Sequence, residues 1–111
     1  MDTIGQRGMF MLLEFSVVPV GKGESVSQYV AECLKIVVSS GLPYKINPMG
    51  TVLEGDYDEV MGVVRACHKR VMELCPRVIT TIRIDDRKGA SGAMDSKVKS
   101  VEALMGRTLD R

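Results

Sequence analysis

The segment Tyr44-Lys-Ile-Asn47, Pro48-Met-Gly50, Thr51-Val-Leu-Glu54 decides the fold class, because it predicts two short strands joined by a tight turn. Proline and glycine at this spacing are typical of a turn, and the runs on either side are rich in strand-forming residues. The centre of the chain is therefore predicted to be a β-hairpin, and the remaining elements are arranged around it.

Helical patterns flank the hairpin on both sides. Before it, Ser25 and Gln28 have capping-box spacing, and the helix they begin is predicted to end near Gly41 in a left-handed cap. After it, Asp56 followed by Glu59 predicts the start of a second helix. The predicted buried stripes are Val26, Val30, Cys33, Leu34 and Val37 in the first helix and Val60, Val63, Val64, Cys67, Val71 and Leu74 in the second.

Two further strands and a last helix complete the prediction. A run of β-formers over residues 9–19 is the first strand, and a β-branched run over residues 77–85 is the fourth. Alternation separates Met11, Leu13, Phe15 and Val17 from Phe10, Leu12, Glu14, Ser16 and Val18. Asp95 is expected to cap a final helix with Val98, Val101, Leu104 and Met105 on one side.

This order predicts an α+β fold, a ferredoxin-like βαββαβ sandwich with an additional C-terminal helix. With 111 residues the chain is one domain, placed at 9–106 between an N-terminal extension (1–8) and a C-terminal tail (107–111). Right-handed crossovers place both main helices on one sheet face. The other face stays open and partly apolar, which predicts a homo-oligomer.

Composition excludes several functional classes. Fifteen Lys and Arg against 14 Asp and Glu give a net charge of +1, which argues against nucleic acid as a partner. The apolar runs are far shorter than a membrane span, and residues 1–8 do not form a signal-peptide pattern. Three cysteines without CxxC spacing are interpreted as reduced core thiols in a cytoplasmic protein: Cys33, Cys67 and Cys75.

Polar residues within the predicted strands are the candidate functional groups, because burying one costs free energy unless a partner satisfies it. They are Glu14, Ser16, Thr51, Glu54, Thr80, Thr81 and Arg83. In one interpretation Glu14 and Glu54 simply pair with Arg77 or Arg83. In the other, a carboxylate, one or two hydroxyls and an arginine converge near a sheet face and bind a small polar heterocycle.

Evidence for catalysis or metal binding is weak in the sequence. His68 is the single histidine and is interpreted as a helix-surface residue. No metal cluster and no catalytic set is predicted, so the protein is expected not to be an enzyme and to need no cofactor. The methionines are interpreted as core filler: Met49, Met61, Met72, Met94 and Met105.

Several motifs together resemble the small single-domain thiamine-binding protein family. They are Phe15-Ser-Val-Val-Pro19, Pro48-Met-Gly-Thr-Val-Leu-Glu-Gly55 leading into Asp58-Glu-Val-Met61, Arg77-Val-Ile-Thr-Thr-Ile-Arg-Ile-Asp-Asp-Arg87, and Lys97-Val-Lys-Ser-Val101. The resemblance covers about residues 9–105. It implies a ferredoxin-like fold, a homotetramer built as a dimer of dimers, and non-catalytic binding of thiamine or its hydroxymethylpyrimidine part in thiamine supply or salvage.

The ligand-binding positions carried over by this resemblance are Ser16, Gly50, Thr51, Glu54, Thr80 and Arg83. A carboxylate such as Glu54 would accept a hydrogen bond from the exocyclic amine of an aminopyrimidine, with Ser16 or Thr51 completing the pattern. Leu12, Leu53 or Met49 would form the apolar wall. A regular strand, however, places Thr51 and Glu54 on opposite faces, so at most one of the two lines a given face.

Three alternatives remain open. One is an oligomeric regulatory or structural protein that senses another small metabolite. An acylphosphatase-type hydrolase has the same element order, but the loop Pro19-Val-Gly-Lys-Gly-Glu24 departs from that family's pattern and has no arginine. An RNA-recognition domain also has this order, but the third predicted strand has no aromatic residue for base stacking.

Overall fold

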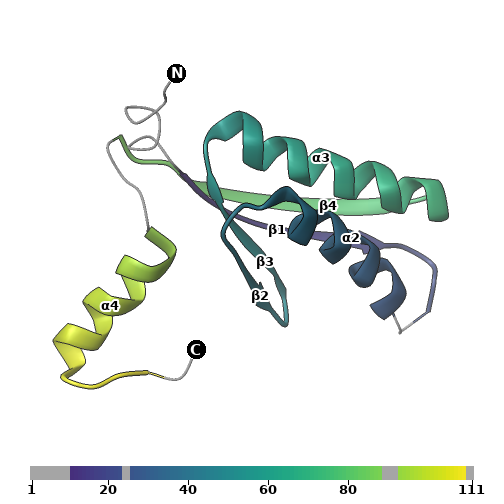
Figure 1. Ribbon diagram of the computed structural model, residues 1–111. Helices are drawn as coiled ribbons and strands as arrows, with labels where there is room; N and C mark the ends of the chain where they lie inside the picture. The colour runs from purple at the N-terminus through teal and green to yellow at the C-terminus, as the bar shows by residue number, and fades with distance from the viewer. Residues whose placement is uncertain (1–10, 24–25, 89–92, 110–111) are drawn as a thin grey trace.

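The computed structural model describes residues 11–23, 26–88 and 93–109. The elements follow one another as predicted (Figure 1). They are β1 (Met11–Pro19), α2 (Ser27–Ser40), β2 (Tyr44–Asn47), β3 (Gly50–Gly55), α3 (Tyr57–Leu74), β4 (Val78–Asp85) and α4 (Ala93–Met105). Met9 and Phe10 of the predicted first strand lie outside the described residues.

The four strands form one antiparallel sheet in the order β2-β3-β1-β4. In its register Leu13 of β1 lies opposite Leu53 of β3 and Ile84 of β4. Residues directly opposite one another share a sheet face, so this register assigns every strand residue to one of two faces.

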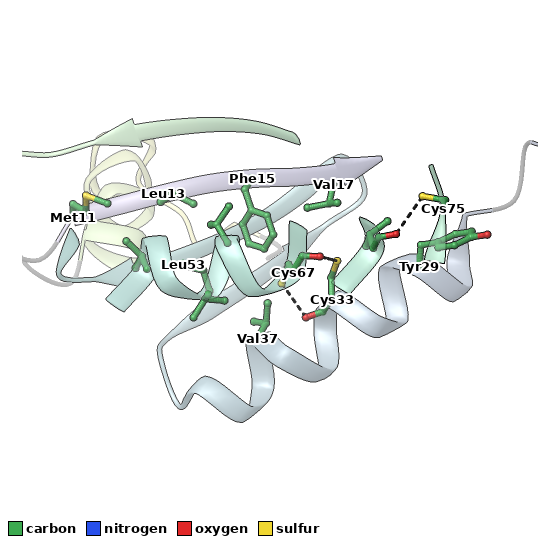
Figure 2. Packing of buried hydrophobic residues seen from close by; sticks show 14 residues of the cluster. Met11, Leu13, Phe15, Val17, Tyr29, Cys33, Val37, Leu53, Cys67 and Cys75 are labelled. Atoms are coloured by element: carbon green, nitrogen blue, oxygen red, sulfur yellow. Dashed lines mark hydrogen bonds between the residues drawn. The ribbon is translucent and has the colours of Figure 1, made fainter. Parts of the chain in front are cut away.

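The core lies between one sheet face and both main helices, as predicted. Met11, Leu13, Phe15 and Val17 of β1 are buried, and Figure 2 shows them with the buried residues of α2 and α3. We call this the helix face of the sheet and the opposite one the open face. The open face carries Leu12, Glu14, Ser16 and Val18 of β1.

Local capping signals give the start of α3 and the end of α2 correctly. Asp56 and Glu59 form the predicted capping box of α3, with the Glu59 amide donating to Asp56 at 2.8 Å. Gly41 ends α2 with φ of 76°, the left-handed cap that glycine adopts without strain. Ser25 of the capping box predicted for α2 lies outside the described residues, and Val26, the N-cap of that helix, makes no side-chain cap hydrogen bond. The prediction of Asp95 as the cap of α4 was wrong, since that helix begins at Ala93.

Two helix faces differ from the prediction. In α2 the buried residues are Tyr29, Cys33 and Val37, whereas Val30 is 40% exposed. In α3 the predicted stripe is buried except for Leu74, which lies at the exposed end of the helix. Apolar residues occur on more than one side of α2, so only packing against α3 selects the buried side.

The methionine interpretation holds only in part. Met61 packs against the core, but Met49, Met72 and Met105 are exposed. Met49 sits in the hairpin turn, and Met72 faces outward from α3. The side chain of Met94 lies outside the described part of the structure. Apolar residue type alone therefore does not mark the core of this chain.

Helix α4 stands apart from the other two helices, at the lower left of Figure 1. An ion pair between Lys97 of α4 and Asp85 of β4 ties the helix to the end of the sheet. The lysine holds the pKa of the Asp85 carboxyl below its usual range, through a direct hydrogen bond and its positive charge. Within the described residues, no helix is long and apolar enough to cross a membrane.

Candidate functional site

The five predicted site residues other than Gly50 are divided between the two sheet faces. Ser16, Glu54 and Arg83 belong to the open face, where they lie opposite Thr81, Leu12 and Glu14 respectively. Thr51 and Thr80 belong to the helix face, where they lie opposite Phe15 and Val17. The expected separation of Thr51 from Glu54 is therefore present, and the six residues do not form one cluster.

On the open face the charged side chains pair within the chain. Arg83 forms an ion pair with Glu14 at 3.5 Å, which is the simpler of the two interpretations of these strand residues. Glu54 is buried on the same face. A broad groove of about 420 Å³ runs between this part of the sheet and Lys97 of α4.

Thr80 lies in a different groove, between β4 and α3. Its hydroxyl is 2.6 Å from Nδ1 of His68, so this histidine, predicted to lie on the helix surface, is half-buried and contacts the strand. The groove is broad, about 650 Å³, and Asp58 and Arg65 also line it. Its central polar pair, His68 with Thr80, is already satisfied within the chain.

Three of the predicted residues meet in a smaller pocket of about 170 Å³: Ser16, Gly50 and Thr51. Its walls come from the end of β1, the turn between β2 and β3, and the first half of α2. The apolar lining includes Val17, Val30, Leu34, Ile46 and Met49. The exposed Val30 that departed from the predicted core stripe is thus a wall of this pocket. We call it the hairpin pocket.

The pocket lies where β1 still pairs with β4 but no longer pairs with β3. Pairing of β1 with β3 ends at Phe15 and Thr51, whereas pairing of β1 with β4 continues to Pro19. An alanine-like Cβ at Gly50 would lie 3.0 Å from the Phe15 carbonyl oxygen, so that carbonyl faces the hairpin side. Backbone groups alternate in direction along a strand, so the amide and carbonyl of Val17 face the same side as those of Phe15. The amide and carbonyl of Val17 therefore border the pocket, beyond the last pair of residues that joins β1 to β3.

Thr51 is the most informative residue of the hairpin pocket. The residue as a whole is only 9% exposed. Among residues 11–23, 26–88 and 93–109, no group forms a hydrogen bond with its hydroxyl. Leaving a buried hydroxyl unsatisfied costs about 1–3 kcal/mol, and such groups are rare without a reason. A polar ligand atom in the pocket would satisfy it.

The strand β3 has a glycine at each end, Gly50 and Gly55, and both have a structural reason. A Cβ at Gly50 would meet the backbone of Phe15, and a Cβ at Gly55 would lie 3.2 Å from Val60 and 3.3 Å from Leu42. Each glycine allows an approach closer than a side chain permits. The first fixes the hairpin turn against β1, and the second lets α3 begin directly after the strand.

The hairpin pocket is uncharged. Among the described residues that line it there is no acidic or basic side chain, and its polar groups are Ser16, Asn47 and Thr51. Sequence reasoning missed Asn47, although an asparagine directly before the Pro-x-Gly turn was a visible signal. Within the described residues no group of three or more His, Cys, Asp or Glu side chains could hold a metal ion.

Comparison with known proteins assigns this chain to a family. The family model for thiamine-binding protein matches residues 13–102, which include every described wall of the hairpin pocket. The chain belongs to the thiamine-binding protein family. A UPF0045 protein of Synechocystis is 43% identical over 100 residues, covering 89% of this chain and 83% of its own length.

Solved structures agree with this membership in the thiamine-binding protein family. A protein of Methanocaldococcus jannaschii is 35% identical and superposes with a TM-score of 0.79, covering 84% of this chain and 96% of its own. A candidate thiamine biosynthesis/salvage protein of Thermotoga maritima has a TM-score of 0.72 over 83% of this chain and 98% of its own. At 21% identity, the second comparison supports the fold alone.

Proposed function

We propose that this protein binds thiamine or its hydroxymethylpyrimidine part in the hairpin pocket and does not transform it chemically. The observation that carries the proposal is the buried Thr51 hydroxyl, which has no partner among the described residues and lines a neutral pocket in a chain of the thiamine-binding protein family.

The chemistry of the pocket suits an aminopyrimidine. Such a ring offers an exocyclic amine that donates and ring nitrogens that accept. The Thr51 hydroxyl can donate or accept, and the Asn47 amide offers both kinds of group, whereas the Ser16 side chain belongs to the open face. Apolar side chains such as Val30 and Leu34 would cover the ring faces, the usual combination in small-molecule sites.

The volume of the pocket favours the pyrimidine end of thiamine. A cavity of about 150 Å³ holds one benzene molecule, and the hairpin pocket measures about 170 Å³. One six-membered ring therefore fills it. In the proposed complex the thiazolium ring and any phosphate extend past the exposed Met49 toward solvent.

Three broader proposals accompany this one. The sheet order with both main helices on one face is the arrangement expected of the ferredoxin-like split βαβ fold. The partly apolar open face supports a homo-oligomer, with a dimer of dimers as the expected assembly. His68, the single histidine, is bonded to Thr80 and does not line the hairpin pocket, which supports binding over catalysis in that pocket.

Isothermal titration calorimetry with thiamine, thiamine diphosphate and hydroxymethylpyrimidine tests the proposal. We expect all three to bind within about tenfold of each other, 1.4 kcal/mol, because the part they share fills the pocket. Thr51→Val should weaken each of them at least about tenfold. The matched control is Thr81→Val, an exposed threonine on the open face.

The competing placement on the open face is tested in the same experiment. Glu54→Gln should leave binding within about twofold if the hairpin pocket is the site, since Glu54 does not line it. A large loss with Glu54→Gln together with none for Thr51→Val would move the site to the open face. Absence of binding by all three compounds to the folded wild type would overturn the function itself.

A further inference from the structure

Two of the three cysteines face each other across the contact between α2 and α3. The Cys67 thiol lies 3.5 Å from the Cys33 carbonyl oxygen, and the Cys33 thiol lies 4.0 Å from the Cys67 carbonyl oxygen. Figure 2 shows the two side chains directed toward each other at the centre of the helix pair. This reciprocal contact means that each sulfur reaches the backbone of the other cysteine.

The two contacts place the cysteines next to each other across the helix pair. A disulfide spans Cα atoms about 4.4–6.8 Å apart, with the two side chains converging. One cysteine side chain here already spans the gap to the neighbouring backbone. A disulfide forms here only if side-chain rotation brings the two sulfur atoms together, which the peptide mapping below tests.

The two thiols are chemically unequal. Contact with the Cys67 thiol lowers the pKa of Cys33, whereas the same contact, with burial, raises the pKa of Cys67. The thiolate is the form that attacks an oxidant, and Cys33 is the thiol that lines the hairpin pocket and meets one first. Cys67 is then positioned as the thiol that resolves the first product.

Access is the remaining requirement, and the hairpin pocket provides it. Cys33 is 7% exposed and lines the pocket, whereas Cys67 is fully buried behind it. A pocket of about 170 Å³ admits a small oxidant such as a peroxide. The oxidant therefore reaches the reactive thiol first, which is the usual order in redox-sensitive pairs.

We propose that Cys33 and Cys67 are a reversible oxidation site at which a peroxide entering the hairpin pocket creates a disulfide between α2 and α3. The Cys33 thiolate attacks one peroxide oxygen, the O–O bond breaks and hydroxide leaves, giving a sulfenic acid. The Cys67 sulfur then attacks the Cys33 sulfur, the S–O bond breaks and a second oxygen leaves as water. Two thiols are oxidised, one hydrogen peroxide is reduced, and the two thiol protons end in two waters.

Peptide mapping of the full chain tests this directly. Folded protein is treated with hydrogen peroxide, free thiols are blocked, and the denatured chain is digested with trypsin. The sequence separates the cysteines into peptides 23–35, 66–69 and 71–77. We expect the first two to appear joined, with the loss of two hydrogens, and to separate on reduction with dithiothreitol.

Cys75 supplies the matched control. It is buried at the end of α3, where its thiol contacts the Val71 carbonyl at 3.3 Å and the Arg77 carbonyl at 3.7 Å. Cys75→Ser should form the linked peptides as fast as the wild type, whereas Cys67→Ser should leave a sulfenic acid at Cys33 that a dimedone probe captures. Wild-type mapping decides the question even if a variant fails to fold. Three free thiols in the folded, treated protein, or a link that includes Cys75 or a second chain, would overturn the proposal.

Discussion

At the scale of single residues, the variant Thr51→Val distinguishes a contribution to folding stability from a contribution to ligand binding. Valine has nearly the same shape but no hydroxyl, so Thr51→Val removes a buried polar group that has no partner among the described residues. We expect the free energy of unfolding without ligand to stay the same or rise by up to about 2 kcal/mol. Urea denaturation of the ligand-free protein measures this.

The control for that measurement is Thr80→Val, which removes a hydroxyl bonded to His68 at 2.6 Å. That variant should lose about 0.5–1.5 kcal/mol, the net contribution of a typical hydrogen bond. A Thr51→Val protein that is less stable than the wild type by a similar amount would show that the Thr51 hydroxyl already has a partner in the folded chain. The argument for a ligand atom beside it would then fail.

The residue pattern of the strands predicted which side chains share a sheet face, but it did not predict the hairpin pocket. Strand periodicity alone places Thr51 and Glu54 on opposite faces, and the register confirms it. The pocket depends on where β1 stops pairing with β3 while it continues along β4. That point is set by the register between segments about 35 residues apart, for which a local pattern has no signal.

At the scale of elements, the two main helices are joined by charges as well as by their apolar faces. Glu32 of α2 accepts from Arg70 of α3 and from Lys35, each at 3.0 Å. The hydrogen bonds from Lys35 and Arg70 hold the pKa of Glu32 below its ordinary value of 4.5. A carboxyl with a lowered pKa stabilises the fold above its ordinary pKa, and this contribution disappears as the pH falls through the lowered value.

We therefore expect Glu32→Gln to be less stable than the wild type at pH 7, with the difference shrinking below pH 4.5 and disappearing in stronger acid. Thermal unfolding followed over this pH range measures it. Glu73→Gln is the matched control, because Glu73 contacts Arg70 within the same helix and does not link α2 to α3. A difference between wild type and Glu32→Gln that stays constant from pH 7 to pH 3 would exclude the ionised Glu32 as its cause.

Some element boundaries were predicted well from local signals. Asp56 with Glu59 and the glycine at position 41 act on their own helix ends and were predicted correctly, whereas the local signal at Asp95 did not mark the start of α4. The buried side of α2 was predicted less well, because it is apolar at both Tyr29 and Val30 and the position of α3 selects between them. The pocket wall at Val30 is a consequence of that tertiary choice.

At the scale of the whole molecule, the single chain is more extended than a compact domain. Its radius of gyration is 15.5 Å, whereas a compact domain of this length has about 13 Å. Helix α4 stands off the body and carries an almost fully exposed Leu104. The open face adds Val18 and Ile79, which lie opposite each other on β1 and β4 and are both exposed. These apolar surfaces are the reason to expect a second copy to pack there.

Sedimentation equilibrium of wild-type protein should accordingly give a mass that is a multiple of the 12.2 kDa chain, with four copies as the expected assembly. Ile79→Asp introduces a charge into the open face and should lower that mass, because an unpaired charge buried in an interface strongly opposes association. Val38→Asp is the control, since Val38 is similarly exposed but belongs to α2, on the other side of the sheet. Circular dichroism should show both variants folded. A wild-type mass of one chain, or an assembly that Ile79→Asp leaves intact, would remove the open face from the interface.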